Sequence, residues 1–189
     1  SGIRAWASEP GEYYHSFDGS YGGLWRRNGR PPQLLAGVGF SAQGKFEGSY
    51  YRRTAESHAP DLVWMFEGIG DQEILGDFGF SGGGAAGFEL DRADVRLGTP
   101  EEVRVVASSE NHTSSFVLVP EEMLTHITNW PGEEEQQKLI RSDIVYFQTP
   151  SGGEVFSTGS ITFCGSLPWN DFDNNISRLL ENVIRRFLQ

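Results

Sequence analysis

A run of six very small residues, Gly82 to Gly87, constrains this chain more than any other feature of its sequence. Glycine is costly in a folded chain unless the backbone must turn sharply or pass close to something else. Directly after the run, Glu89 stands between two apolar residues, Phe88 and Leu90. The run predicts a bent or closely approached backbone that could hold the Glu89 carboxylate against a ligand. The alternative is a flexible surface loop with a solvated charged end, since glycine-rich loops are common.

The glycine run does not match a phosphate-binding loop. Gly82, Gly84 and Gly87 have the spacing of a dinucleotide-binding turn, but in so dense a run of glycines that spacing arises by coincidence. No lysine is near in the sequence, although the other common type of phosphate loop requires one. The sequence therefore does not indicate a nucleotide site here.

The composition narrows the class of protein. With 189 residues, 38% of them hydrophobic, the chain is long enough for one domain with a buried core. Its net charge of −11 argues against nucleic acid or an anionic membrane as a partner, because both need a basic surface. No apolar run is long enough to span a membrane, and no secretory signal is present.

The chain contains one cysteine, Cys164, so no intrachain disulfide can form. This favours a reducing compartment, and we expect a cytoplasmic protein. Cys164 closes the apolar run 161–164, and this position predicts a small core residue rather than a nucleophile.

Compact apolar runs predict the strands of a sheet. We expect buried strands at four segments, which are 33–40, 62–66, 102–108 and 144–147. Shorter strands are predicted at 71–80, 116–119, 155–158 and 160–164. Because near-continuous apolar strands need cover on both faces, the buried set favours a mostly parallel sheet between layers of helices.

The C-terminal segment 173–188 is the clearest helix in the sequence. Asp171 or Asp173 can cap its start, and Arg185 and Arg186 complement the negative end of its dipole. Its apolar residues fall on one helical face, and they are Ile176, Leu179, Leu180, Val183, Ile184 and Phe187. We expect this face to pack on the sheet.

Two shorter helices are also predicted. One covers 133–141, where Glu134 stands four residues before Lys138 and can pair with it. The other begins at Pro120, which suits the first position of a helix. Helices packed on a sheet of short apolar strands predict an α/β fold.

The motifs of several hydrolase classes are missing. The four histidines have no zinc-protease spacing, and no G-x-S-x-G nucleophile turn is present. Glu110, Asn111 and His112 follow the strand predicted at 102–108, where active-site loops often lie, so they are candidates for ligand contact. The segment 12–15 (Glu-Tyr-Tyr-His) could in principle bind a metal, but adjacency is a poor template for coordination.

Several motifs are specific when they are taken together. They include GEYYHS at 11–16, GGLWR at 22–26, GRPPQ at 29–33, GVGF at 37–40, GIG at 68–70, GGGAAGFELDR at 82–92, SSE at 108–110, GSI at 159–161, CGSLP at 164–168 and DNNISR at 173–178. From about residue 4 to its end, the chain resembles the C-terminal region of the large (β) subunit of N,N-dimethylformamidase. This resemblance implies that residues 1–189 are a single domain and the C-terminal part of a longer large subunit.

The resemblance implies a fold and a chemistry. The expected fold is a glutamine-amidotransferase-like three-layer α/β sandwich, or its C-terminal part, with a mixed, mostly parallel sheet and a C-terminal helix. The expected activity is hydrolysis of N-substituted formamides to formate and an amine. The family uses a mononuclear iron held by tyrosine and carboxylate oxygens. We expect these ligands upstream of Ser1, so no metal ligand is assigned to this chain.

The resemblance also implies partners and one catalytic residue. The partners are a small amide substrate, a small helical subunit and the upstream part of the large subunit, and we expect a homo-oligomer. Glu89 matches the family glutamate that acts beside the iron as a base or water-positioning group. We expect the chain to be inactive by itself. The alternative is a non-catalytic binding or scaffold domain of the same fold.

Overall fold

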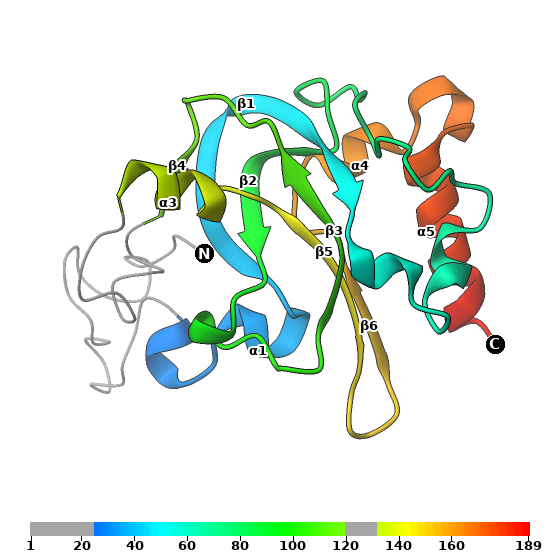
Figure 1. Cartoon of the computed structure of the whole chain (residues 1–189), viewed down its shortest axis with the longest axis horizontal. Helices are drawn as coiled ribbons and strands as arrows, with labels where there is room; N and C mark the ends of the chain where they lie inside the picture. The colour runs from blue at the N-terminus through cyan, green and yellow to red at the C-terminus, as the bar shows by residue number, and fades with distance from the viewer. Residues whose placement is uncertain (1–24, 120–131) are drawn as a thin grey trace, which may run out of the picture.

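The computed structural model describes residues 25–119 and 132–189, and its centre is one curled sheet (Figure 1). Within these residues, every strand pairing is antiparallel, in the order β2-β1-β3-β5-β6, and β4 also pairs with β1. The strands are β1 (Gly39–Arg53), β2 (Ala86–Arg92), β3 (Arg104–Glu110), β4 (Val117–Leu118), β5 (Asp143–Gln148) and β6 (Glu154–Ser157).

The prediction of a mostly parallel three-layer sandwich is therefore wrong. Consecutive strands such as β5 and β6 are joined by a short turn, which antiparallel pairing allows and parallel pairing does not. The 15-residue strand β1 is shared by the pairings of the curled sheet, because its residues 39–49 pair with β2, residues 42–43 also pair with β4, and residues 50–53 pair with β3.

Among residues 25–119 and 132–189, the helices and 3₁₀ turns are short except for the last helix. The α-helices are α1 (Pro32–Ala36), α3 (Glu133–Leu139), α4 (Phe163–Ser166) and α5 (Asn175–Phe187). Five 3₁₀ turns are η1 (Trp25–Asn28), η2 (Ala55–His58), η3 (Val63–Phe66), η4 (Val95–Leu97) and η5 (Trp169–Phe172). Among the described residues, no helix has the length and apolar character needed to cross a membrane.

Two of the four predicted buried strands form helical turns instead. Segment 33–40 begins within α1, which ends where Gly37 adopts a left-handed conformation with φ of 77°, and β1 starts only at Gly39. Segment 62–66 is almost entirely η3. A short apolar run has no periodicity that distinguishes a buried strand from a buried helical turn, and this is why both predictions failed.

The remaining strand predictions have mixed outcomes. Segments 102–108 and 144–147 are confirmed as β3 and β5. The shorter segments 116–119 and 155–158 contain β4 and most of β6. Segment 71–80 contributes a single isolated bridge to β1 rather than a strand.

Cys164 is exposed, so its prediction as a core residue is wrong. The run 160–164 is not a strand, because α4 begins at Phe163. Phe163 enters the core with 2% of its surface exposed, and the next residue points elsewhere because a helix turns by about 100° per residue.

The helix predictions that fall on described residues are confirmed. The C-terminal helix is α5, although Asn174 caps its start by accepting a hydrogen bond from the Ser177 N–H, and neither Asp171 nor Asp173 does so. The helix predicted at 133–141 is α3, and its Lys138 ammonium lies 3.1 Å from Glu134. The helix predicted to begin at Pro120 lies outside the described residues.

Within the described residues, the core has three clusters of buried side chains, the smallest formed by Val38, Ala93 and Val145. In the first cluster, α5 and η3 pack against β3 and β5, and the buried residues include Met65, Val106, Ile144, Ile176, Leu179 and Val183. Burying side chains of this size contributes roughly 1.5–3 kcal/mol each. On β1, β2 and β4, a second cluster is formed by Ala42, Leu90, Phe116 and Leu118, with Leu139 and Ile140 packed against it.

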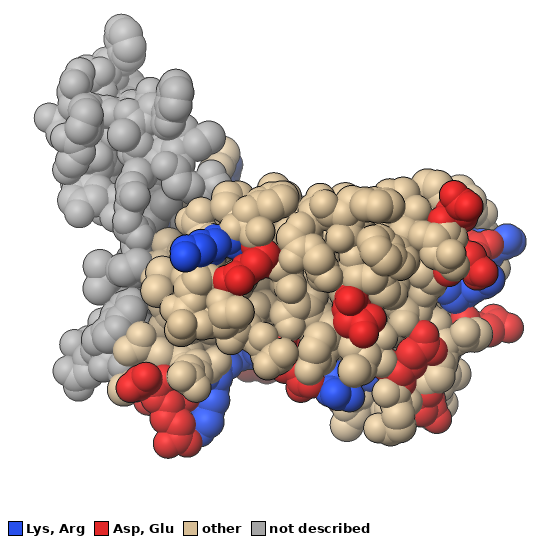
Figure 2. Space-filling view, turned by 90° about the horizontal axis from the view of Figure 1, so that it is seen from above, with Lys and Arg blue, Asp and Glu red and all other residues tan. Residues whose placement is uncertain are grey.

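The surface seen from above is weakly charged. Figure 2 shows a broad uncharged area across the middle of this side, with acidic and basic residues scattered mostly towards its two ends. Lysine and arginine do not gather into a patch on this side, which agrees with the composition-based argument against nucleic acid.

The glycine run lies where two strands pass unusually close. Between the pairs Gln43–Glu89 and Gly48–Gly87, the four β1 residues 44–47 face a single β2 residue, Phe88. A Cβ atom at Gly87 would overlap the carbonyl oxygen of β1 residue 47. The prediction of a closely approached backbone is confirmed, and the run creates a wide bulge rather than a loose loop.

Replacing Gly87 by alanine should therefore destabilise the fold by about 1–3 kcal/mol, because the added methyl group meets backbone that cannot move aside. Urea unfolding measures the change. Gly132→Ala is the matched control, because a Cβ there meets open space, and we expect a loss within about 1 kcal/mol. Equal stability of both variants would show that the close strand crossing does not exist in solution.

Candidate functional site

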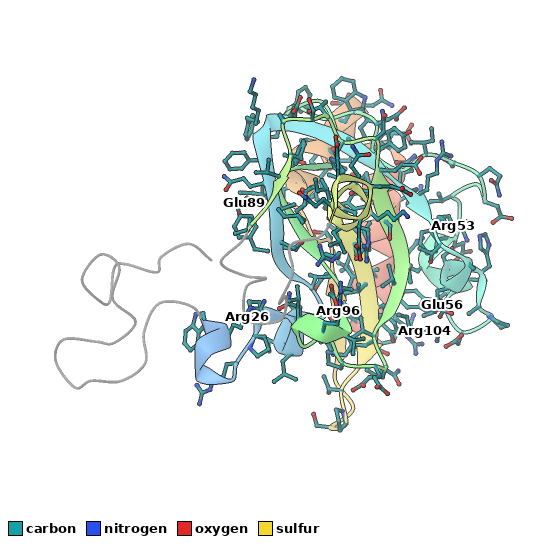
Figure 3. The ribbon with its side chains drawn as sticks, turned by 60° about the vertical axis from the view of Figure 1, so that its left-hand side comes forward. Arg26, Arg53, Glu56, Glu89, Arg96 and Arg104 are labelled. Atoms are coloured by element: carbon teal, nitrogen blue, oxygen red, sulfur yellow. The ribbon has the colours of Figure 1, made fainter. Side chains whose placement is uncertain are left out.

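Glu89 lies in the middle of β2, on the face opposite the second core cluster. Residues directly paired across antiparallel strands share a face, and Ala42 pairs with both Leu90 and Leu118 in the second core cluster. The next β1 residue, Gln43, pairs with both Glu89 and Val117. Successive residues point to opposite faces, so these three side chains form a row on the outer surface. Figure 3 shows Glu89 at the edge of the molecule, beside β1 and β2.

Exposed apolar side chains occur near Glu89 in the sheet. Val117, which shares the row with Glu89, is 61% exposed. Phe46 in the bulge is 62% exposed and packs at a tilt against Phe88, with ring centroids 5.5 Å apart. We call the surface formed by Gln43, Glu89 and Val117 the Glu89 face.

The residue before Glu89 is held in a rare conformation. Phe88 has φ of 59°, which is sterically unfavourable for a bulky side chain and costs about 1–3 kcal/mol. The bulge, the neighbouring glycine and the Phe46 ring impose this conformation together. It determines the direction in which the chain presents Glu89.

The Glu89 carboxylate makes no hydrogen bond or ion pair within the part of the chain that the structure describes. It does not line the cleft between the loop after β3 and α3, the groove along α5 or the cleft beside Arg104. The half-buried carboxylate is thus available for an external group.

The other predicted site residues come together in a cleft of about 560 Å³ between the loop after β3 and α3. Glu110, Asn111 and His112 line one side, and Gln137 and Arg141 lie on the other. Glu110 is paired with the exposed guanidinium of Arg52, and Asn111 has the left-handed φ of 62° that asparagine tolerates in a turn. All three residues line this cleft, and their contact with a ligand stays a prediction.

Two neighbours of His112 were not predicted from the sequence. The Nε2 atom of His112 lies 2.6 Å from the Oγ atom of Ser109, which also accepts a hydrogen bond from the Ser142 N–H at 2.7 Å. The Nδ1 atom of His112 is buried and has no hydrogen-bond partner among the described residues. Glu47 on the bulge accepts hydrogen bonds from Thr113 and Ser115 in the same loop.

His112 is held neutral. Burial lowers the pKa of its imidazole from 6.5 to about 4, and the nearby Glu47 carboxylate only partly opposes this shift. Ser109 is buried, with 5% of its surface exposed, and the His112 ring packs on Phe116. These contacts favour a structural role for the Ser109–His112 pair, which fixes the loop to the sheet.

The chain should become less stable in mild acid because of His112. An unfolded histidine takes up a proton near pH 6.5, but the folded one does so only near pH 4, so the free energy of unfolding falls between these values by up to about 3 kcal/mol. Denaturant titrations at pH 7.5, 5.5 and 4.5 measure how the free energy of unfolding depends on pH. Glutamine in His112→Gln can still bond to Ser109 but does not titrate, so the free energy of unfolding of this variant should fall less between pH 7.5 and pH 4.5. An equal fall in both proteins would contradict a neutral His112.

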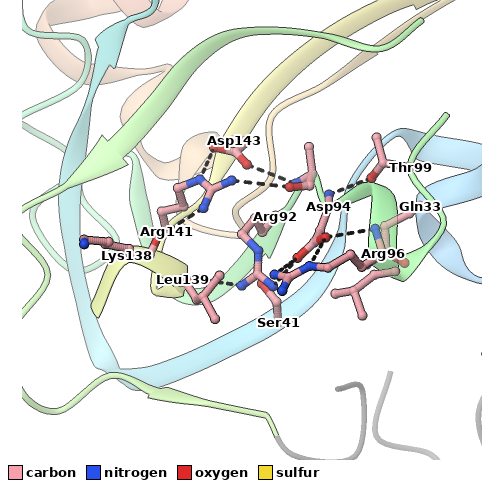
Figure 4. Close-up of polar contacts among 12 residues, drawn as sticks. Gln33, Ser41, Arg92, Asp94, Arg96, Thr99, Lys138, Leu139, Arg141 and Asp143 are labelled. Atoms are coloured by element: carbon pink, nitrogen blue, oxygen red, sulfur yellow. Dashed lines mark hydrogen bonds and ion pairs between the residues drawn. The ribbon is translucent and has the colours of Figure 1, made fainter. Parts of the chain in front are cut away.

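A buried network of charges holds the end of β2 (Figure 4). Arg92 is fully buried and donates to the Leu139 carbonyl at 2.6 Å and to Asp94 at 2.9 Å. Asp143 is also fully buried and accepts from Arg141 at 3.0 Å. The network connects β2, β5 and the end of α3, so it fixes the strand that carries Glu89.

The described residues do not form a metal site of the usual kind. Within 25–119 and 132–189, no group of three or more His, Cys, Asp or Glu side chains could hold a metal ion. The segment 12–15 lies outside the described residues. In the described part of the chain, His, Cys, Asp and Glu side chains thus do not form an iron site by themselves.

Comparison with known proteins identifies the family. Residues 1–175 match the family model described as N,N-dimethylformamidase beta subunit-like, C-terminal. The chain is 39% identical over 188 residues to the N,N-dimethylformamidase beta subunits of Alcaligenes sp. and of Paracoccus aminophilus. These alignments cover 100% of this chain but 24% of each relative, so the chain spans about a quarter of their length. The resemblance predicted from the motifs is confirmed, and the chain belongs to the family of N,N-dimethylformamidase beta subunit-like C-terminal regions.

Proposed function

We propose that this chain is the C-terminal part of a longer hydrolase that converts N-substituted formamides to formate and an amine. The observation that carries the proposal is the 39% identity over the whole chain to two N,N-dimethylformamidase beta subunits. The unpartnered carboxylate of Glu89 beside the glycine run supports it, because the run contributes to the resemblance and the structure presents this carboxylate at the surface.

In the proposed reaction, Glu89 acts as the general base. Its carboxylate accepts a proton from a water molecule while the water oxygen forms a bond to the carbonyl carbon of the amide. The C–N bond then breaks and the proton passes to the departing nitrogen. One amide and one water thus give one formate and one amine. The rigid bulge and the strained Phe88 would hold the base in a fixed direction.

We propose that iron belongs to the longer protein and that its ligands come from outside this chain. The proposal follows from the resemblance of this chain to the C-terminal region of the family. No step of the reaction above is routed through iron. The proposed partners are the rest of the large subunit and a small helical subunit, and the beta-subunit names of the relatives support a multi-subunit enzyme.

An assay of the longer protein tests the proposal. Purified protein is incubated with N,N-dimethylformamide, N-methylformamide, formamide and acetamide, and amine or ammonia release is measured over time. We expect turnover of at least one N-substituted formamide. A folded protein that releases no amine from any of the four would favour the alternative of a non-catalytic scaffold domain.

A further inference from the structure

Only one edge of β2 is paired with other strands among the described residues, because β2 is the first strand in the order of the sheet. Along its other edge runs the segment 158–160, which we call the edge segment. Ser160 forms an isolated antiparallel bridge with Leu90, and the Asp91 N–H donates to the Gly159 carbonyl at 2.7 Å. The edge segment therefore lies directly against the strand that carries the candidate base.

The Ser160 hydroxyl takes the place of a strand partner for Gly87. Its Oγ atom accepts a hydrogen bond from the Gly87 N–H at 2.7 Å and donates one to the Gly87 carbonyl at 2.9 Å. One side chain thus pairs both backbone polar groups of this residue and fixes the peptide planes on its two sides. Glycine has the widest choice of backbone conformations, so these planes depend strongly on such a contact.

The second of these planes determines the path of the chain towards Glu89. The Gly87 carbonyl and the Phe88 N–H belong to the same planar peptide unit. Phe88 continues from this unit with φ of 59°, and Glu89 follows directly. A residue in so strained a conformation persists only where the surrounding structure over-determines it. The Ser160 hydroxyl supplies one of the contacts that do so, and the closely packed β1 backbone at residue 47 supplies another.

The edge segment is itself held by the core. The hydroxyl of Tyr51, a fully buried residue, donates to the Thr158 carbonyl at 2.7 Å. Gly159 has φ of 65°, and a Cβ atom there would overlap the carbonyl oxygen of Asp143. The Ser160 hydroxyl is thus presented from a rigid support, which is what precise positioning of another group requires.

We propose that Ser160 is a positioning residue for the proposed reaction. By holding the Gly87 backbone, it sets the direction in which the chain presents the Glu89 carboxylate. This inference rests on the proposed function and adds to it a residue from outside β2. Ser160 acts through the backbone and takes no part in the chemical step. The effect on the rate is large, because a misplacement of about 1 Å in a reacting group can cost about 10²-fold.

Kinetics of the longer protein with N,N-dimethylformamide test this role. Ser160→Ala removes the hydroxyl, and we expect kcat to fall by about 10–100-fold while KM stays within about threefold. Ser160→Thr restores a hydroxyl, so its kcat should lie within about threefold of the parent value. Ser157→Ala is the matched control, because the half-buried Ser157 hydroxyl donates to a backbone carbonyl of α1 rather than of β2. Its kcat should stay within about twofold of the parent value.

A double-mutant cycle separates positioning of the base from a general structural effect. If Ser160 acts through Glu89, its loss should matter little once the base is gone. In the Glu89→Gln background, Ser160→Ala should therefore change kcat by less than about threefold. An equal loss of kcat in both backgrounds would overturn the proposal, and so would a kcat of the single variant Ser160→Ala within about twofold of the parent value.

Amide hydrogen exchange gives a readout that does not depend on hydrolysis. Because the Gly87 N–H donates to Ser160, Ser160→Ala should speed its exchange by about tenfold or more, whereas the amides of α5 should exchange as in the parent. Ser160→Thr and Ser157→Ala should keep the parent rate at Gly87. Unchanged exchange at Gly87 in Ser160→Ala would exclude the positioning role alone. Absence of turnover in the parent, or full turnover of Glu89→Gln, would instead exclude the proposed function and this role together.

Discussion

Replacing Glu89 by glutamine in the longer protein is expected to lower the turnover of an N-substituted formamide by about 10²–10⁴-fold, which is the usual contribution of a positioned general base. Glutamine keeps the size of the side chain and can form hydrogen bonds, but it cannot accept the proton of the attacking water. The residue makes no hydrogen bond or ion pair within the described part of the chain. The substitution should thus change the free energy of unfolding by less than about 0.5 kcal/mol.

Steady-state kinetics and urea unfolding of the same preparation decide the role of Glu89. Glu56→Gln is the control, because Glu56 is also a carboxylate but lies outside the candidate site and is paired with Arg104 at the surface. Its turnover should stay within about threefold of the parent, since exposed ion pairs contribute little. If Glu89→Gln retains turnover within about twofold, Glu89 is not the base, and Glu110 and His112 become the next candidates.

The largest loss of stability is expected from Asp143→Ala. Asp143 is fully buried and accepts hydrogen bonds from the Ser108 hydroxyl at 2.6 Å, the Ala93 N–H at 3.0 Å and the Arg141 guanidinium at 3.0 Å. Alanine leaves these donors unpaired in the interior and breaks a buried ion pair, which costs about 3–5 kcal/mol. The loss should appear as a lower midpoint of urea unfolding.

A carboxylate at the surface provides the comparison. Asp71 lies 3.0 Å from the Arg53 guanidinium, but its own side chain is 75% exposed. Asp71→Ala should therefore change the free energy of unfolding by no more than about 1 kcal/mol. A similar small change for Asp143→Ala would mean that the charge network at the end of β2 does not stabilise the fold.

Local sequence patterns identified the elements whose structure depends on neighbours along the chain. The apolar face of α5 has helical periodicity over several turns, so Ile176, Leu179 and Val183 were correctly expected to pack on the sheet. The glycine run was correctly associated with close backbone approach, because Gly87 has no room for a side chain.

The direction of the strands could not be read from the same patterns. Apolar runs such as 144–147 suit a central strand of either a parallel or an antiparallel sheet, and β5 is antiparallel on both sides. Runs as short as 62–66 do not reveal whether they form a strand or a helical turn. The resemblance to known proteins did not correct these errors, since the fold expected from it was also wrong.

Only part of the candidate site could be predicted from the sequence. Glu89 was singled out by its place after the glycines and by the resemblance. The open surface around it depends on pairing with Gln43 and Val117, residues distant from Glu89 in the sequence. Ser109 carries no local signal of its contact with His112, because a serine inside an apolar strand resembles any other small residue. The bulge on β1 that brings Phe46 to Phe88 depends on long-range register, which a single sequence does not encode in a readable pattern.

Hydrolysis in water enriched in ¹⁸O tests most directly whether this chain belongs to a formamide hydrolase. The longer protein is incubated with N,N-dimethylformamide, and formate and dimethylamine are both quantified while the formate is analysed by mass spectrometry. The proposed reaction predicts equal amounts of the two products and one ¹⁸O atom in each formate, at a rate strongly reduced in Glu89→Gln. Amine release without an equal amount of singly labelled formate, or no release from a folded protein, would contradict it.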